Sequence, residues 1–145
     1  MGRIVHIEGP GKERNLLCRE IVIALNEFIG LSNINSEAKD IAAYIVICLE
    51  AINATIEQSV SAWEKRGYWV KSDRFRIEWY WIEQLAPEMK AAVISEDWDV
   101  VIRIAGQIGS KLNKVKKPKR IQLNKPWIGA WDKLSIVKKL SRELS

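Results

Sequence analysis

Three glutamates, Glu50, Glu57 and Glu64, have a spacing that could support chemistry, because they recur every seven residues along one helical segment. Carboxylates on one helical face could bind a metal ion or exchange protons with a substrate. The same spacing is typical of a solvated face whose glutamates pair with Lys or Arg of a neighbouring helix. We favour the second interpretation. We therefore expect a protein that is not an enzyme, with no catalytic residues, no metal site and no cofactor.

Other catalytic patterns are weak. The only histidine is His6, in the N-terminal segment, and no serine or cysteine stands beside it to form a nucleophilic site. The sequence contains neither the Glu-x-x-His pairs of carboxylate di-iron bundles nor the Cys-x-x-Cys pairs of zinc fingers. The segment Gly9-Pro10-Gly11-Lys12 only partly matches a phosphate-binding loop. We expect it to form a turn into the first helix, with a weak anion site at that helix start as the alternative.

Positive charge is concentrated near the C-terminal end. The net charge of the chain is +5, but residues 100–145 contain twelve basic and only two acidic residues. Lysine and arginine bind nucleic acids by neutralising phosphates, so this imbalance points to an anionic partner. The alternatives are a solubilising connector, or a tail that lies on the protein's own acidic faces. The candidate nucleic-acid-binding residues are Lys111, Lys114, Lys116, Lys117, Lys119, Arg120 and Lys125.

Aromatic residues offer a second kind of contact. Seven tryptophans occur in the chain, and Trp63, Trp79 and Trp98 fall on the apolar seams of helices, where we expect them to pack. Residues 63–71 mix aromatic rings with lysine and arginine, a combination that can stack bases and contact phosphates. We favour a simpler role, in which these rings cover one end of a helical bundle.

Five further aromatic and apolar residues are candidates for a partner interface. Ile77, Tyr80 and Trp81 lie away from the seam of their helix, and a helix that is apolar on two faces is usually buried on both. Either the C-terminal tail covers this second face, with Trp127 and Trp131, or a second subunit does. We favour the second subunit and therefore expect a homo-oligomer. Trp127 and Trp131 are expected to dock the tail on the bundle, with a partner contact as the alternative.

Apolar residues repeat at helical spacing along most of the chain, which predicts an all-α protein. We expect Ser36 to cap the second helix, Gly67 to close it in the left-handed conformation, and Pro87 to kink or break the third. Alternating spacings of three and four residues predict an up-down-up-down four-helix bundle. A short extended segment at residues 3–8 would precede it. The helices are expected at about residues 12–29, 37–66, 68–93, 95–115 and 128–144.

The chain is expected to form one domain, with the bundle in residues 1–112 and a basic connector and terminal helix in residues 113–145. No apolar run is long enough to span a bilayer, and residues 1–6 lack the apolar core of a signal peptide. Cys18 and Cys48 stand among apolar residues, so we expect buried, reduced thiols. These features predict a cytoplasmic protein without a membrane partner.

Two local stretches carry a family resemblance, the aromatic segment Asp73–Trp81 and the segment Ala105–Ser110 that runs into lysines. With the length, basic charge and expected helix count, they resemble small basic four-helix-bundle proteins of two kinds. One kind is encoded in intervening sequences of ribosomal RNA, and the other comprises accessory proteins of diversity-generating retroelements. The resemblance implies a ring-like oligomer that binds nucleic acid nonspecifically.

The sequence thus predicts a non-enzymatic, oligomeric helical bundle that binds nucleic acid or another polyanion through its basic C-terminal third. The alternative is a protein–protein scaffold or assembly subunit that uses the second apolar face of the third helix.

Overall fold

The computed structural model describes residues 9–116 and 124–135. All regular structure in these residues is helical, which confirms the predicted all-α class. The expected extended segment at residues 3–8 lies outside the described residues. A short helical segment begins at Ala130 and includes Ser135, the last described residue. The long helices are α1 (Gly9–Gly30), α2 (Ser36–Lys65), α3 (Trp69–Ile94) and α4 (Trp98–Lys111).

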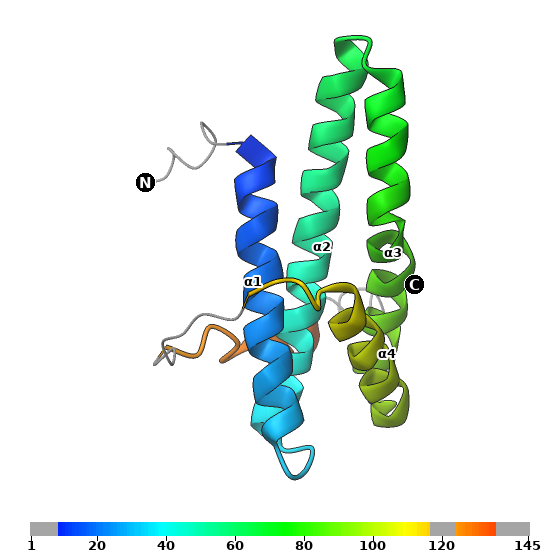
Figure 1. The fold of residues 1–145 in the computed structure, drawn as a ribbon. Helices are drawn as coiled ribbons and strands as arrows, with labels where there is room; N and C mark the ends of the chain where they lie inside the picture. Colours follow the sequence, from blue (N-terminus) through cyan, green and yellow to red (C-terminus); the bar gives the residue numbers. More distant parts are fainter. Residues whose placement is uncertain (1–8, 117–123, 136–145) are drawn as a thin grey trace.

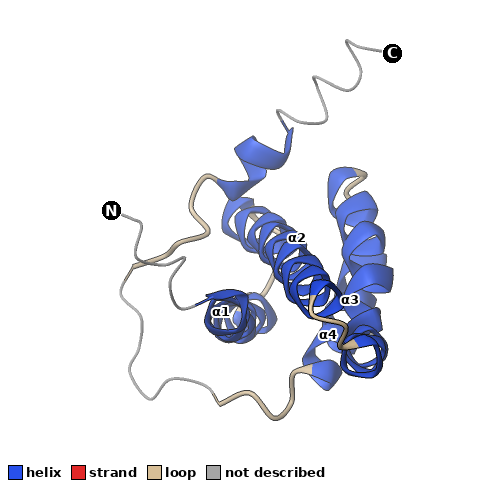
Figure 2. Ribbon diagram, turned by 90° about the horizontal axis from the view of Figure 1, so that it is seen from above, coloured by secondary structure: helices blue, strands red, loops and turns tan. Residues whose placement is uncertain are grey.

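Helix α2 is central to the arrangement. It packs along α1 on one side and along α3 on the other, and α4 packs mainly on α3 (Figure 1). Viewed from above, α1 and α3 lie on opposite sides of α2 (Figure 2). Helix α1 makes only sparse contact with α4. Helices α1 and α3 therefore flank α2, whereas α4 is held mainly by α3, and α1 and α4 do not pack closely together.

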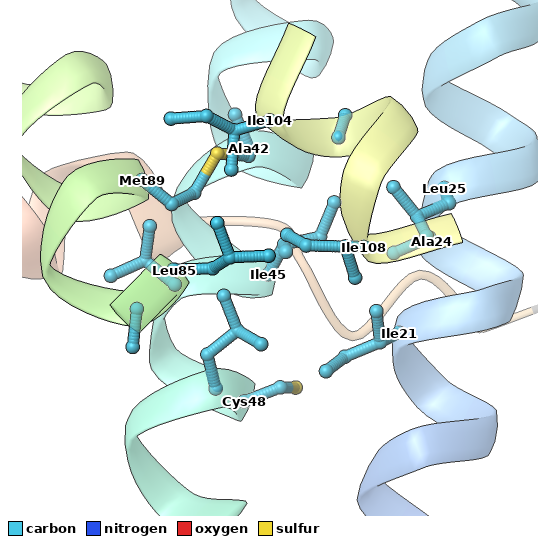
Figure 3. Packing of buried hydrophobic residues seen from close by; sticks show 14 of the residues in the cluster. Ile21, Ala24, Leu25, Ala42, Ile45, Cys48, Leu85, Met89, Ile104 and Ile108 are labelled. Carbon is cyan, nitrogen blue, oxygen red and sulfur yellow. The ribbon is translucent and has the colours of Figure 1, made fainter. Parts of the chain in front are cut away.

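The core forms where apolar side chains of all four helices meet (Figure 3). Ile21 of α1, Ile45 of α2, Met89 of α3, and Ile104 and Ile108 of α4 are fully buried there. All five residues lie within the helices that were predicted from the sequence. Burial of such side chains is the main favourable term in folding.

Two helix ends share one closing geometry. Gly67 follows α2 with a φ of 80°, and the Tyr68 amide donates back to the Trp63 carbonyl at 2.9 Å. This left-handed closure confirms the prediction for Gly67. After α3, Glu96 takes the same role with a φ of 58°, and the Asp97 amide donates to the Ala92 carbonyl at 2.9 Å.

Several expected boundaries were wrong. Because residues 95–97 close α3, α4 begins at Trp98 rather than Ser95. Asn35, not Ser36, caps α2, since its side-chain oxygen accepts from the Ala38 amide at 2.9 Å. Helix α1 begins at Gly9, so the expected turn at residues 9–11 is its first turn. Of the two outcomes expected at Pro87, a kink or a break, the break is not observed, because α3 continues through Pro87 to Ile94.

The C-terminal segment docks on the first turns of α2. Asp40 accepts two backbone hydrogen bonds, from the Gly129 amide at 3.2 Å and from the Trp131 amide at 3.0 Å. Trp127 is only 2% exposed, and its indole donates to Glu37 at 3.3 Å. The carboxylate of Asp40 therefore holds the start of the terminal helical segment in the way that a capping residue does.

Trp127 and Trp131 contact the bundle, as the favoured interpretation predicted, and the structure shows this role in place of the alternative partner interface. Trp127 belongs to the chain's own core, where its ring meets Tyr44 edge-on at 6.4 Å. Trp131 is half-buried, and its ring lies 6.5 Å from that of Trp98. The described part of the tail therefore covers α2 and not the second face of α3.

Replacing Asp40 with alanine should loosen this docking. Two amides would lose a charged acceptor, so we expect the free energy of unfolding to fall by about 1–2 kcal/mol. Urea denaturation followed by tryptophan fluorescence measures the change. The matched control is Asp132→Ala, which removes an exposed carboxylate of the terminal segment and should change stability little. Equal stability of the two variants would contradict the capping role of Asp40.

Candidate functional site

A cleft of about 720 Å³ lies between α1, α3 and the end of α4. Its volume falls within the range of small-molecule binding sites, which is roughly 300–1,000 Å³. Four of its lining residues are cationic and none is acidic. The lining residues are Lys12, Asn15, Cys18, Arg19, Trp79, Lys111, Leu112, Val115 and Lys116.

Helix geometry places the polar residues of α1 on one wall. Lys12, Asn15 and Arg19 follow one another at spacings of three and four, so they share one face of α1. Lys111 is the last residue of α4 and belongs to the other wall. The chain then turns, with the Val115 amide donating to the Leu112 carbonyl at 3.0 Å, and crosses toward α1 (Figure 1, yellow). This turn brings Lys116 to the cleft.

No acidic residue of the described chain lines the cleft. Arg19, Lys111 and Lys116 form no ion pair with a carboxylate of the described residues. Like charges on facing walls raise the local potential, and an anion between them lowers the electrostatic energy. The cleft is therefore suited to an anionic ligand.

A fifth cation is buried beside the cleft. Arg14 is only 6% exposed, and its guanidinium donates to the hydroxyls of Ser59 at 3.3 Å and Thr55 at 3.4 Å. The same group lies over the rings of Phe75, at 4.6 Å, and Trp79, at 5.7 Å. Burial lowers the pKa of Arg14, but a guanidinium keeps its proton at neutral pH. Arg14 thus adds positive charge behind the ring that lines the cleft.

Trp79 is the aromatic wall of the cleft. Its ring lies 6.2 Å from Phe75 and 6.2 Å from Trp81, the latter at an interplanar angle of 27°. Together with Arg14, these neighbours fix the orientation of a side chain that is only half-buried. A ring that is both held in place and accessible can stack against a planar ligand.

The cleft contains two of the cations predicted from the sequence, Lys111 and Lys116. Lys114 is exposed but does not line the cleft. Lys125 pairs with Glu37 at 3.0 Å, so this cation lies on an acidic face of its own chain, as one of the alternatives proposed. The remaining candidates, Lys117, Lys119 and Arg120, lie outside the described residues.

Sequence reasoning missed the contribution of α1. It considered only a weak anion site at the helix start, and Arg19 and Trp79 were not assigned to any site. The spacing of Lys12, Asn15 and Arg19 was the available signal. The facing wall could not be inferred, because it depends on how the chain turns after α4.

The repeated glutamates of α2 pair with cations of α3. Glu57 and Glu64 lie 3.6 and 3.7 Å from the guanidinium of Arg76, and Glu50 lies 3.1 Å from the ammonium of Lys90. These contacts confirm the favoured prediction, in which the three glutamates form a solvated face of α2 that pairs with cations of a neighbouring helix. Among residues 9–116 and 124–135, no group of three His, Cys, Asp or Glu side chains is placed to hold a metal ion.

No family model, curated protein or solved structure matches this chain. Candidate functions therefore depend on the chain's own geometry. In the described part of the chain, no helix has both the length and the apolar character needed to cross a membrane.

Both cysteines are buried and unlinked. Burial raises the pKa of the Cys18 thiol to about 11 and that of the Cys48 thiol to about 12. Cys18 lines the cleft, but at neutral pH it carries its proton and is a poor nucleophile.

These pKa values predict a loss of stability at high pH. The unfolded chain releases thiol protons near the ordinary pKa of 9.0, whereas the native state keeps them up to about 11 for Cys18. The unfolded state therefore binds fewer protons, so stability is full below pH 9 and falls as pH rises toward 11. Urea denaturation at several pH values should show this fall. It should be shallower in Cys18→Ala and Cys48→Ala, and identical slopes in these variants and the wild type would contradict the assignment.

Proposed function

We propose that the protein is a non-enzymatic binder of nucleic acid or another polyanion, and that the basic cleft is its contact site. The observation that carries this proposal is the convergence of cations from α1 and from the end of α4 on one cleft that no acid lines. Cations that already lie together gain more from a phosphate chain than isolated surface lysines do, because binding also relieves their mutual repulsion.

A polymer fits better than a small anion. Lys117, Lys119 and Arg120 come within four residues of Lys116 in the sequence, so this part of the chain carries several cations in a row. A row of cations matches a row of phosphates, and each contact releases counterions from the nucleic acid. The family resemblance of segments 73–81 and 105–110 supports the same function and a homo-oligomeric state.

We also infer that the four helices form an up-down-up-down bundle that is open between α1 and α4. The α1–α2 loop and the α2–α3 turn lie at opposite ends of the molecule (Figure 1), and the two helices that would close the bundle make few contacts. This opening is where the cleft lies.

Removing the cleft cations should weaken binding. In the variant Arg19→Ala/Lys111→Ala/Lys116→Ala, we expect the affinity for a fluorescent oligonucleotide to fall at least about tenfold at moderate salt. The slope of log affinity against log salt should decrease by about 2–3, because three phosphate contacts are lost. Fluorescence anisotropy across a salt series measures both quantities.

The matched control for this variant removes three exposed cations that do not line the cleft: Lys65→Ala/Arg66→Ala/Lys133→Ala. It changes the net charge equally and should keep most of the affinity. If the control loses as much affinity as the cleft variant, binding depends on overall charge and not on the cleft. Loss of affinity only in the control would move the site to the cations that the control removes, at the α2–α3 turn or on the terminal segment.

A second candidate function is a protein–protein scaffold or assembly subunit. The observation that favours it is the outer face of α3, where Ile77 is 78% exposed and Tyr80 is 52% exposed. Trp69 and Val70, at the start of the same helix, are 59% and 66% exposed. Large apolar side chains gathered on one helix are typical of a contact surface.

Replacing Ile77 with aspartate should test this candidate. The side chain is mostly exposed, so the folded chain should tolerate the change, whereas an apolar interface would lose a contact and gain a buried charge. We expect light scattering to show dissociation of an assembly to smaller species. Gln84→Asp, an exposed position of the same helix, is the control. A wild-type protein that is already monomeric would remove the support for assembly through this face.

A further inference from the structure

Trp79 is unusual among the residues of the cleft because it offers a planar apolar surface between cationic walls. Lys12 and Arg19 lie on one wall, and Lys111 and Lys116 lie on the other. A phosphate chain alone would need only the cations. The ring adds a surface that can recognise a planar, uncharged group attached to that chain.

We propose that the cleft binds single-stranded nucleic acid, with one base stacked on Trp79 and the flanking phosphates held by the cations of the two walls. This inference rests on the proposed polyanion-binding function and adds the class of nucleic acid. Proteins that bind single strands without sequence preference combine a basic groove with aromatic side chains in this way.

The support behind Trp79 makes the ring a suitable stacking surface. The Arg14 guanidinium lies 5.7 Å from its centroid, and the Phe75 and Trp81 rings lie at 6.2 Å. Arg14 is itself fixed by Ser59 and Thr55 of α2. A ring already held in one orientation loses little conformational entropy when a base stacks on it.

A duplex matches this site less well. In a double helix, each base face is covered by the next base pair, so stacking on Trp79 would require a base to leave the stack at a cost of a few kcal/mol. The cleft is also a local feature of about 720 Å³ between three helices, which suits a few groups of a strand rather than a rod-like duplex. The cations could still contact duplex phosphates at the rim, but the ring would then contribute nothing.

The first experiment compares three ligands of equal length on the wild-type protein. They are a thymidine oligonucleotide, the same sugar–phosphate chain without bases, and a duplex, each measured by fluorescence anisotropy at several salt concentrations. We expect the single strand with bases to bind about 5- to 150-fold more tightly than the strand without bases, which is the contribution of one stacked base. The salt slopes of these two single strands should be equal, because stacking does not change the number of phosphates contacted.

The second experiment replaces the ring. Trp79→Leu should lose the preference for the strand with bases, whereas Trp79→Phe, which keeps an aromatic face, should retain most of it. Trp69→Leu is the matched control, because Trp69 is exposed and lies outside the cleft. Circular dichroism and urea denaturation establish that each variant is folded. If Trp79→Leu does not fold, the comparison of strands with and without bases on the wild type still decides the question.

Three outcomes would overturn the inference, and they separate it from the proposed function. Equal binding of the strands with and without bases would remove stacking but leave polyanion binding intact. Duplex binding that is as tight as single-strand binding and unchanged in Trp79→Leu would assign the cleft to duplex phosphates. If none of the three ligands binds at low salt, both the inference and the proposed function are wrong.

Discussion

The buried guanidinium of Arg14 is the interaction on which the upper half of the molecule depends. A charged side chain that is 6% exposed and has no carboxylate partner among the described residues must satisfy its donors in another way. It does so with two hydroxyls of α2 and two aromatic faces of α3. The first turns of α1 are therefore tied to both other helices. Once they are fixed, Lys12, Asn15 and Arg19 take their positions on the cleft wall, and Trp79 is held opposite them.

The distribution of ion pairs explains why the cleft is positive although the chain contains 18 acidic residues beside its 23 basic ones. Four acids of α2 are paired with cations outside the cleft: Glu50 with Lys90, Glu57 and Glu64 with Arg76, and Glu37 with Lys125. Such partly exposed pairs contribute only about 0–1 kcal/mol each to stability. Their larger effect is on the electrostatic field. They neutralise charge on the surface of α2, whereas Arg19, Lys111 and Lys116 of the cleft form no ion pair in the described part of the chain.

The sequence predicted those features that depend on local pattern, and it failed where a feature depends on tertiary contact. The apolar seam of α2 and the closure at Gly67 follow from residue spacing and backbone preference, and both are observed. Asn35 and Ser36 are both good capping residues, so only the observed hydrogen bond to Ala38 decides between them. Docking of Trp127 on the bundle was expected, but the pattern could not show that Glu37 and Tyr44 are the residues that its indole contacts. The cleft was missed for the same reason, since its walls come from residues about a hundred positions apart.

The two faces of α3 connect the candidate functions. Trp79 lies on the side of the cleft, whereas Ile77 and Tyr80 are exposed. Trp81 is half-buried and lies 6.2 Å from Trp79, so its ring reaches from the outer face to the support of the cleft. A contact that reoriented Trp81 would change the packing against Trp79, because closely packed rings transmit displacement to one another. The proposed assembly surface and the proposed ligand site therefore share one packed aromatic layer.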